Sequence, residues 1–177
     1  LAVFAKERVA GLLLNDIGPT LEPAGLLRIR SYLGVEPKDK DLSAAAERLA
    51  KTTEGVEGLS KAEWLAHAHR LFRDDGGVPR LDYDPLLATT FPSEEQIRAT
   101  PGPELWDLFH KLPDIPLALL HGKNSNLLSA STVADMKAAK PALMVTTVPQ
   151  RAHVPFLDES SSQAGIAAWL QAVDSRS

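Results

Sequence analysis

One loop histidine is the residue of this chain best suited to acid–base chemistry. His153 follows residues 142–148 (ALMVTTV), an apolar run that Pro149 closes. Such a run is typical of a strand buried in a parallel sheet, and α/β proteins place active groups in the loops after such strands. Because histidine titrates near neutral pH, it can accept a proton and return it within one catalytic cycle. The alternative interpretation is a surface loop histidine.

Two further polar segments also follow apolar runs. Asp16 comes directly after residues 9–15 (VAGLLLN), and Asn126 lies in the loop that follows residues 115–120 (IPLALL). Taken alone, Asp16 is equally well explained as a cap or turn residue, and the Asn-rich loop as an ordinary turn. The carboxyl ends of parallel strands meet at one edge of a sheet, however, so we expect the carboxylate, the amide and His153 to converge there. This arrangement resembles part of a nucleophile–His–acid site.

The elements around these loops indicate an α/β protein. A predicted helix over residues 132–139, capped by Ser129 or Ser131, separates the last two strands and completes a βαβ unit. A closing helix is predicted over residues 163–173, because its apolar positions share one face. Residues 1–8 (LAVFAKER) have the pattern of an amphipathic helix that begins abruptly at Leu1, so we interpret the N-terminus as a cut.

Between the first and second strands lies a long helical insert. Helices are predicted over residues 23–33, 42–51 and 103–111, and no strong strand signal occurs in this region. Another helix begins at Ser60 with a capping box to Glu63, carries Trp64 and Phe72 on its apolar face, and ends at residues 75–77 (DGG). Ligands bind outside the carboxyl ends of parallel strands, so an insert there is suited to be a lid over a pocket.

These segments together resemble the α/β-hydrolases, in particular the bacterial hydrolases with a helical lid. The resemblance covers nearly the whole chain, and the order and spacing of short motifs carry it; they lie at residues 9–23, 24–34, 81–85, 105–109, 115–129 and 149–159. It implies the C-terminal part of a mostly parallel α/β-hydrolase sheet, its last three strands, with a helical lid insertion. The core would comprise residues 1–19 and 112–177, and the lid residues 20–111.

The resemblance assigns roles to the polar loops. His153 falls on the family's catalytic histidine, whose loop is usually written G-H-x-P and here reads Ala152-His153-Val154-Pro155. The family usually has an aspartate after Ser125, where this chain has Asn126. Asparagine carries no charge to stabilise an imidazolium, and in serine proteases this change costs about 10⁴ in kcat. Some α/β-hydrolases take the acid from the end of the sixth strand, where Asp16 lies, so Asp16 and Asn126 both remain candidates.

The implied activity is hydrolysis of an ester-like or other carbon–heteroatom bond in a small, partly apolar substrate, by covalent nucleophile–His–acid catalysis. The family's Gly-x-Ser-x-Gly nucleophile elbow is absent from these residues, so we expect the nucleophile upstream of residue 1. The missing N-terminal half, from the same or another chain, is then a required partner, and residues 1–177 alone are expected to be inactive and insoluble or molten. The alternative is a non-catalytic relative or fragment that acts in binding or assembly.

Three aromatic residues are candidates for the substrate pocket: Trp64, Phe72 and Trp106. Core packing is the competing explanation for all three, because large aromatic residues are usually buried. No cofactor is expected for this chemistry.

Several classes of function are disfavoured. A net charge of −4 without a basic run gives no reason to expect a nucleic-acid partner. The absence of cysteine excludes disulfides and thiolate catalysis and is compatible with the cytoplasmic location that we expect. No apolar stretch approaches the ~20 residues of a membrane span. No metal is expected, because His67 and His69 point to different sides of a helix and His110 and His121 have no partner at ligand spacing.

Overall fold

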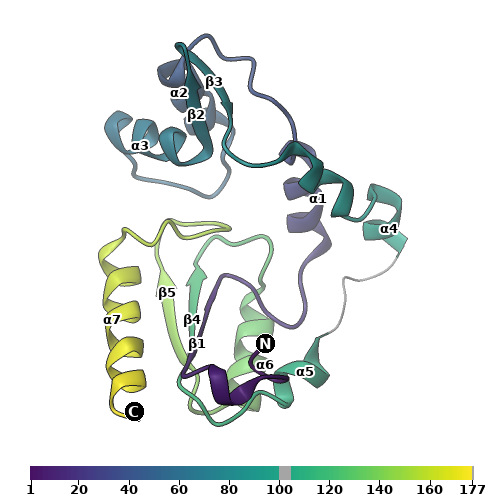
Figure 1. Cartoon of the computed structure of the whole chain (residues 1–177), viewed down its shortest axis with the longest axis vertical. Helices are drawn as coiled ribbons and strands as arrows, with labels where there is room; N and C mark the ends of the chain where they lie inside the picture. The colour runs from purple at the N-terminus through teal and green to yellow at the C-terminus, as the bar shows by residue number, and fades with distance from the viewer. Residues whose placement is uncertain (100–104, 177) are drawn as a thin grey trace.

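The computed structural model describes residues 1–99 and 105–176 and has two parts, a parallel-sheet core and a helical insert above the carboxyl ends of its strands (Figure 1). The elements in chain order are a 3-10 helix Lys6–Arg8, β1 Leu12–Asn15, α1 Pro23–Tyr32, α2 Leu42–Thr52, α3 Lys61–Leu71, β2 Phe72–Asp75, β3 Val78–Leu81, a 3-10 helix Pro85–Thr90, α4 Glu94–Ala99, α5 Trp106–His110, β4 Leu117–Gly122, α6 Ala130–Ala139, β5 Met144–Val148 and α7 Ser160–Asp174.

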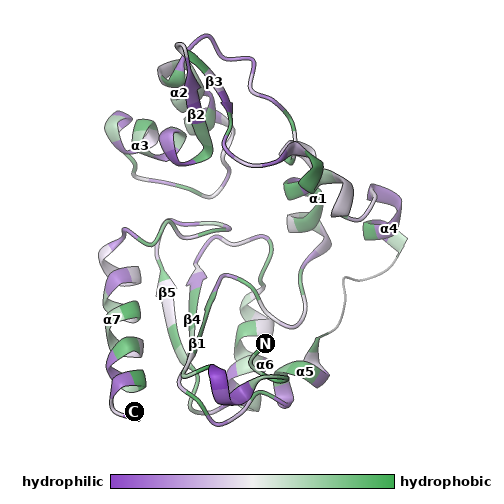
Figure 2. Ribbon diagram, in the orientation of Figure 1, coloured by the Kyte–Doolittle hydropathy of each residue, from purple (hydrophilic) through white to green (hydrophobic). Residues whose placement is uncertain are grey.

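The core sheet has three parallel strands in the order β1-β4-β5. β4 lies in the centre and is buried along its whole length, whereas β1 and β5 are partly exposed. Burial on both faces is therefore confirmed for β4 only, because β1 and β5 each pair on a single side in this sheet. Leu117 and Leu119 of β4 are buried in a hydrophobic cluster, against which Leu12 and Leu14 of β1 pack. Figure 2 colours the ribbon of these strands by hydropathy.

The two helices of the core cover opposite faces of the sheet. On one face, Met136 of α6 packs in a buried cluster with Leu117 and Leu119 of β4. On the other face α7 approaches closely at Gly165, where a Cβ atom would lie 2.5 Å from Thr146 Oγ1. Ser129 is the N-cap of α6, since its side chain accepts a hydrogen bond from the backbone N–H of Thr132. The predicted strand–helix–strand–helix order is confirmed.

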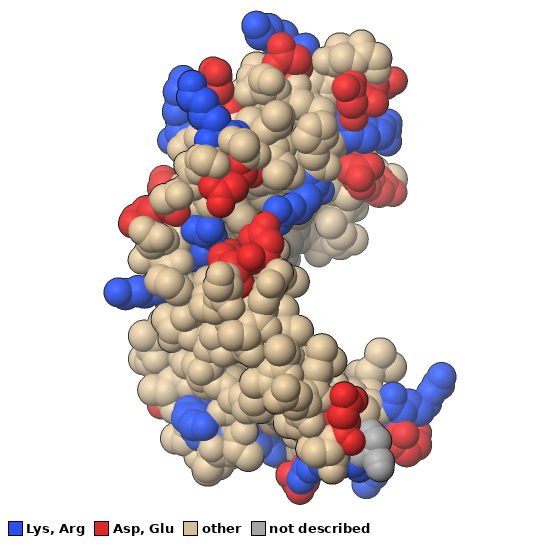
Figure 3. Space-filling view, turned by 90° about the vertical axis from the view of Figure 1, so that its left-hand side faces the viewer, with Lys and Arg blue, Asp and Glu red and all other residues tan. Residues whose placement is uncertain are grey.

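The insert has a small core of its own. α2 packs against α3, and the capping box between Ser60 and Glu63 is present as predicted. The buried members of this cluster are Leu42, Ala45, Ala46, Trp64, Ala68, Phe72 and Leu81. Charged side chains gather on the surface of the insert, whereas the core surface on the α7 side is largely uncharged (Figure 3).

The expectation of an insert without strands is wrong, because β2 and β3 form an antiparallel hairpin. α3 ends at Leu71, and Phe72 is the first residue of β2 instead of part of the helix. The turn consists of Gly76 and Gly77, with φ of 62° and 92°. Two successive positive φ angles fit the two-residue turn that tight hairpins prefer, and glycine adopts them at little steric cost.

The predicted N-terminal amphipathic helix is also absent. Residues 1–8 form turns and a short 3-10 helix at Lys6–Arg8, and the Phe4 side chain is 84% exposed. An amphipathic helix needs a surface that covers its apolar face, and the described residues offer none to Phe4. Two short elements, the 3-10 helix Pro85–Thr90 and α4, were not predicted. No described helix combines the length and the apolar character that a membrane crossing requires.

Candidate active site

The site is built around Asp16, which follows β1 and is fully buried. Asp16 has a φ of 55°, and its backbone N–H donates to the carbonyl oxygen of Leu120 in the neighbouring strand β4. Carboxylate atom Oδ1 accepts a hydrogen bond from the Gly122 backbone N–H at 2.8 Å. A side chain at position 122 would block this arrangement, since a Cβ atom would lie 2.4 Å from the Ala152 carbonyl oxygen.

The second carboxylate oxygen of Asp16 connects the other two loops. Oδ2 accepts a hydrogen bond from Ser125 Oγ at 2.6 Å and lies 3.0 Å from Nδ1 of His153. Ser125 Oγ in turn accepts from the backbone N–H groups of Leu127 at 3.2 Å and Leu128 at 3.0 Å. The buried carboxylate is thereby surrounded by donors, which is the usual requirement for burying such a group.

The geometry leaves one nitrogen of His153 available for chemistry. The His153 side chain is 18% exposed, and its Nδ1 faces Asp16. A carboxylate accepts hydrogen bonds, so Nδ1 carries the hydrogen in the neutral ring and Nε2 presents a lone pair. No hydrogen bond involves Nε2 in the described part of the chain. A ring oriented in this way can act as a general base at Nε2.

The three loops converge as expected, and of the two candidate acids Asp16 contacts His153. Asn126 does not make the competing contact: it is exposed, and within the described residues its side chain has no hydrogen bond to the ring. The cause is the local turn, in which the Ser125 hydroxyl contacts Asp16 while the next residue is directed toward α1. Backbone placement supports this, because a Cβ atom at Gly25 would lie 2.8 Å from the Asn126 carbonyl oxygen.

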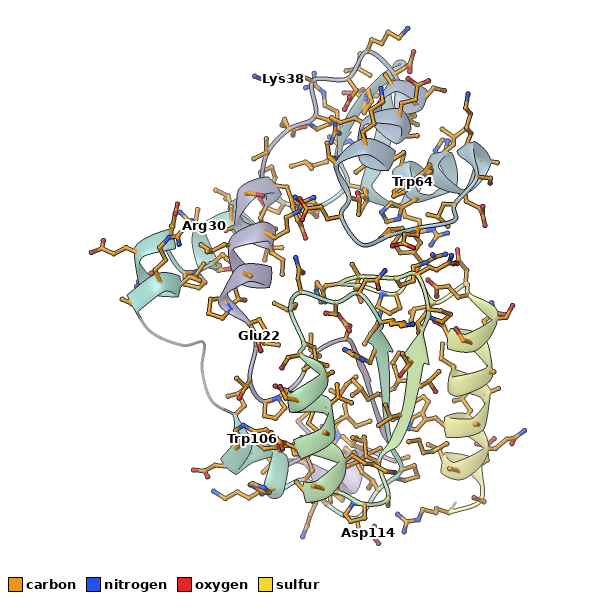
Figure 4. The ribbon with its side chains drawn as sticks, turned by 180° about the vertical axis from the view of Figure 1, so that it is seen from behind. Glu22, Arg30, Lys38, Trp64, Trp106 and Asp114 are labelled. Carbon is orange, nitrogen blue, oxygen red and sulfur yellow. The ribbon has the colours of Figure 1, made fainter. Side chains whose placement is uncertain are left out.

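A cavity of about 640 Å³ lies between the insert and the sheet edge, and His153 and Asn126 line it. Phe72 also lines the cavity, but Trp64 and Trp106, the other aromatic residues expected there, do not. Trp64 belongs to the core of the insert, and Trp106 lies at the far end of the sheet core, where its Nε1 donates to Thr20 Oγ1 at 2.9 Å (Figure 4). Both residues pack in hydrophobic clusters of the structure, and their role in substrate binding stays a prediction.

From the sequence alone, His67 is only a possible metal ligand, and that role is disfavoured. The structure places His67 in the cavity wall. Its ring stacks on Phe156, with centroids 4.1 Å apart and planes 17° apart. Burial, and to a smaller extent the positive charge of Arg70, lowers the pKa of His67 from 6.5 to about 4. The sequence feature that could have indicated this position is spacing: His67 lies one helical turn after Trp64, so both residues share the inward face of the helix. No cluster of three potential metal-ligating side chains occurs among the described residues.

The loop that carries His153 is attached to the insert on both sides of the histidine. Before it, Arg151 Nη1 donates to the carbonyl oxygen of Glu57 at 3.0 Å, and Arg151 Nε pairs with Glu159 at 2.8 Å. After it, Arg70 of α3 forms an ion pair with Asp158. Burial raises the pKa of the Glu159 carboxyl, but hydrogen bonds from Ser162, the Phe156 backbone and Arg151 outweigh this effect and leave the pKa lowered.

The proteins to which this chain is similar include several hydrolases. The chain is 35% identical to an α/β-hydrolase from Novosphingobium aromaticivorans, with a TM-score of 0.81 over 96% of this chain and 60% of that one. It is 30% identical over 164 residues to a 3-hydroxybutyrate-oligomer hydrolase from Cupriavidus necator, a match that covers 89% of this chain and 56% of the relative. A putative hydrolase from Rickettsia typhi has the same fold at 23% identity, with a TM-score of 0.75 over 96% of this chain and 57% of that one.

The chain thus spans somewhat more than half the length of the relatives that it matches. No model of a known protein family matches the sequence. The fold and these relatives show that the chain belongs to the α/β-hydrolase superfamily and has the C-terminal part of that fold. The predicted superfamily and fold class are confirmed.

Proposed function

We propose that this chain is the histidine- and acid-bearing part of an α/β-hydrolase that cleaves an ester-like bond in a small, partly apolar substrate. The observation that supports this most strongly is the 3.0 Å contact between buried Asp16 and His153 Nδ1, which leaves Nε2 free. A histidine with this orientation beside a cavity of about 640 Å³ fits a general base next to a substrate pocket.

In the proposed reaction, the nucleophile comes from the part of the fold that precedes residue 1 in the family order, in the same chain or a second one. Nε2 of His153 removes the proton of the nucleophile as this attacks the ester carbonyl carbon. The negative charge of Asp16 stabilises the imidazolium. Expulsion of the alcohol, which takes the proton from His153, leaves an acyl-enzyme. A water molecule then releases the acid, with His153 again as the base.

The substrate class follows from the cavity and from one relative. Apolar residues from α1, α2 and α3 line the cavity together with charged and hydroxyl-bearing groups, which suits a substrate of mixed character. The relative from Cupriavidus necator is named for 3-hydroxybutyrate oligomers, whose units are joined by ester bonds. We therefore propose short esters of hydroxy acids as substrates, with the insert as the lid over them.

The test uses the complete polypeptide that contains this chain, with p-nitrophenyl butyrate as substrate. We expect the wild-type protein to hydrolyse the ester and His153→Ala to lower kcat by several orders of magnitude, since removing the histidine of a serine-protease triad costs about 10⁶-fold. His69→Ala is the matched control, because His69 is exposed on α3 and away from the cavity lining. An inactive wild-type protein, or a loss below tenfold in His153→Ala, overturns the proposal.

A further inference from the structure

The wall of the cavity that faces His153 contains a second histidine with a fixed orientation. His67 of α3 is stacked on Phe156, as described above, and the edge of Trp64 meets it at a centroid distance of 5.9 Å and an interplanar angle of 72°. Phe156 belongs to the loop that carries His153. These two aromatic contacts hold the plane of the His67 ring, so its polar atoms have defined positions in the cavity wall.

The two ring nitrogens of His67 lie in different environments. Nδ1 is buried and has no hydrogen-bond partner among the described residues. Nε2 also has no partner in the described part of the chain, but it is not buried, and the ring lines the cavity. A neutral imidazole carries one N–H. Either neutral tautomer leaves the buried Nδ1 without a partner, but a hydrogen on Nε2 places the N–H donor at the accessible nitrogen, where an oxygen atom in the cavity can accept it.

The charge state follows from the surroundings of the ring. A protonated ring would need an acceptor at the buried Nδ1, and none is present among the described residues. Burial of the ring is the main cause that opposes a positive charge, Arg70 and Arg151 add to it and Asp158 only partly compensates, so the pKa of His67 lies at about 4. At neutral pH His67 is therefore an uncharged group with a single donor, its Nε2–H. Such a group can recognise an oxygen acceptor but cannot serve as an ionic partner.

Resting on the proposed hydrolase function, we propose that His67 determines substrate specificity by donating a hydrogen bond from Nε2–H to a second oxygen of the ester substrate, a hydroxyl or a carbonyl outside the scissile bond. An ester that lacks this oxygen displaces water from the cavity and leaves the Nε2–H donor of His67 without a partner. A polar group that loses its water without gaining a partner disfavours binding. The site therefore selects substrates whose acyl group carries a second oxygen in addition to those of the scissile ester.

The kinetic test compares two esters that differ by one hydroxyl, ethyl 3-hydroxybutyrate and ethyl butyrate, in the complete protein. The measured quantity is the ratio of their kcat/KM values, followed by acid release. We expect His67→Phe, which keeps the ring stacked on Phe156, to lower this ratio about tenfold, the effect of one hydrogen bond. His67→Gln, whose side-chain amide retains a donor, should restore most of the ratio. An unchanged ratio in His67→Phe, including an equal loss on both esters, overturns the proposal.

A binding measurement separates this proposal from the hydrolase proposal. In the His153→Ala protein with ¹⁵N-labelled histidine, ethyl 3-hydroxybutyrate should shift the Nε2–H resonance of His67, whereas ethyl butyrate should not. Equal shifts with both esters, or no shift with either, overturn the role of His67. A wild-type protein that binds the hydroxy ester through His67 but hydrolyses neither ester would contradict the proposed activity alone.

Discussion

The two sides of the cavity differ in how their polar groups are satisfied. On the sheet side, both carboxylate oxygens of Asp16 have partners: Gly122, Ser125 and His153. On the insert side, neither nitrogen of His67 has a hydrogen-bond partner among the described residues. Reactive groups need fixed positions, and a complete set of internal hydrogen bonds provides them. A group that binds substrate, in contrast, needs a hydrogen-bond donor or acceptor that no protein group occupies.

In the proposed enzyme, the sheet side therefore carries the catalytic step and the insert side determines substrate specificity. Substitutions on the sheet side should affect turnover of every substrate, because they disturb the base itself. Substitutions on the insert side should change which substrates are accepted. The predictions below test this separation, in order of decreasing expected effect.

The largest effect is expected from Asp16→Asn. An amide lacks the charge that stabilises the imidazolium, and its NH₂ group would face one of the donors that now contact Asp16, so kcat should fall about 10⁴-fold. We also expect the free energy of unfolding to decrease by about 1–3 kcal/mol, the cost of an unpaired buried polar group. Steady-state kinetics and urea denaturation measure the two quantities.

Asn126 supplies the comparison for that experiment. It is exposed and has no hydrogen bond to His153 in the described structure, so Asn126→Ala should lower kcat less than tenfold. Asn126→Asp should leave the rate equal or improve it, because it adds a carboxylate at the position where the family usually has one. If Asn126→Ala costs as much as Asp16→Asn, the assignment of Asp16 as the acid is wrong.

An intermediate effect is expected from Ser125→Ala. The Ser125 hydroxyl donates to Asp16 Oδ2 and accepts from the backbone N–H groups of Leu127 and Leu128. Its loss removes one hydrogen bond to a charged group, about 1.5–3 kcal/mol, so both kcat and the free energy of unfolding should decrease, kcat by about tenfold. Ser131→Ala, at an exposed position of α6, is the matched control. Equal behaviour of the two variants would exclude a positioning role for Ser125.

The smallest effect concerns how the free energy of unfolding depends on pH. The pKa of His67 is depressed from 6.5 to about 4 in the folded protein, so the unfolded chain binds the extra proton first as the pH falls. The free energy of unfolding should therefore decrease between pH 6.5 and pH 4, and His67→Phe should reduce this dependence. The groups that act on His67 are Arg70, Arg151 and Asp158. Thermal unfolding at several pH values measures the trend, and an identical slope in wild type and variant would contradict it.

Much of the site could be predicted because it depends on topology. Once residues 9–15, 115–120 and 142–148 are recognised as parallel strands, the loops after them must converge, and Asp16 reaches His153 across β4. The role of Ser125 could not be predicted, because it depends on the direction of one hydroxyl within a turn. Nor could the sequence decide between Asp16 and Asn126, since both follow strands that end at the same edge.

The positions of the aromatic side chains and of the hairpin depend on local packing and not on topology. Trp64 and Trp106 have the residue type expected of a pocket, but only packing decides which aromatic side chains face a cavity and which fill a core. The hairpin was missed because Phe72 continues the apolar spacing of α3 into β2, so the helical pattern extends past the actual end of the helix. Asp75-Gly76-Gly77 was interpreted only as a helix stop, although it also fits a hairpin turn.

Main-chain N–H groups contact the acid and hold its serine partner in place, and this has a consequence for divergence. The N–H of Gly122 contacts Asp16 directly, and those of Leu127 and Leu128 hold Ser125 against it. Replacing either leucine by another apolar residue changes a buried side chain but leaves its N–H in place, so these two hydrogen bonds do not depend on the identity of the side chain. Only Asp16, Gly122, Ser125 and His153 need to keep their identity, which is a small constraint for lineages that separate widely while retaining the same catalytic geometry.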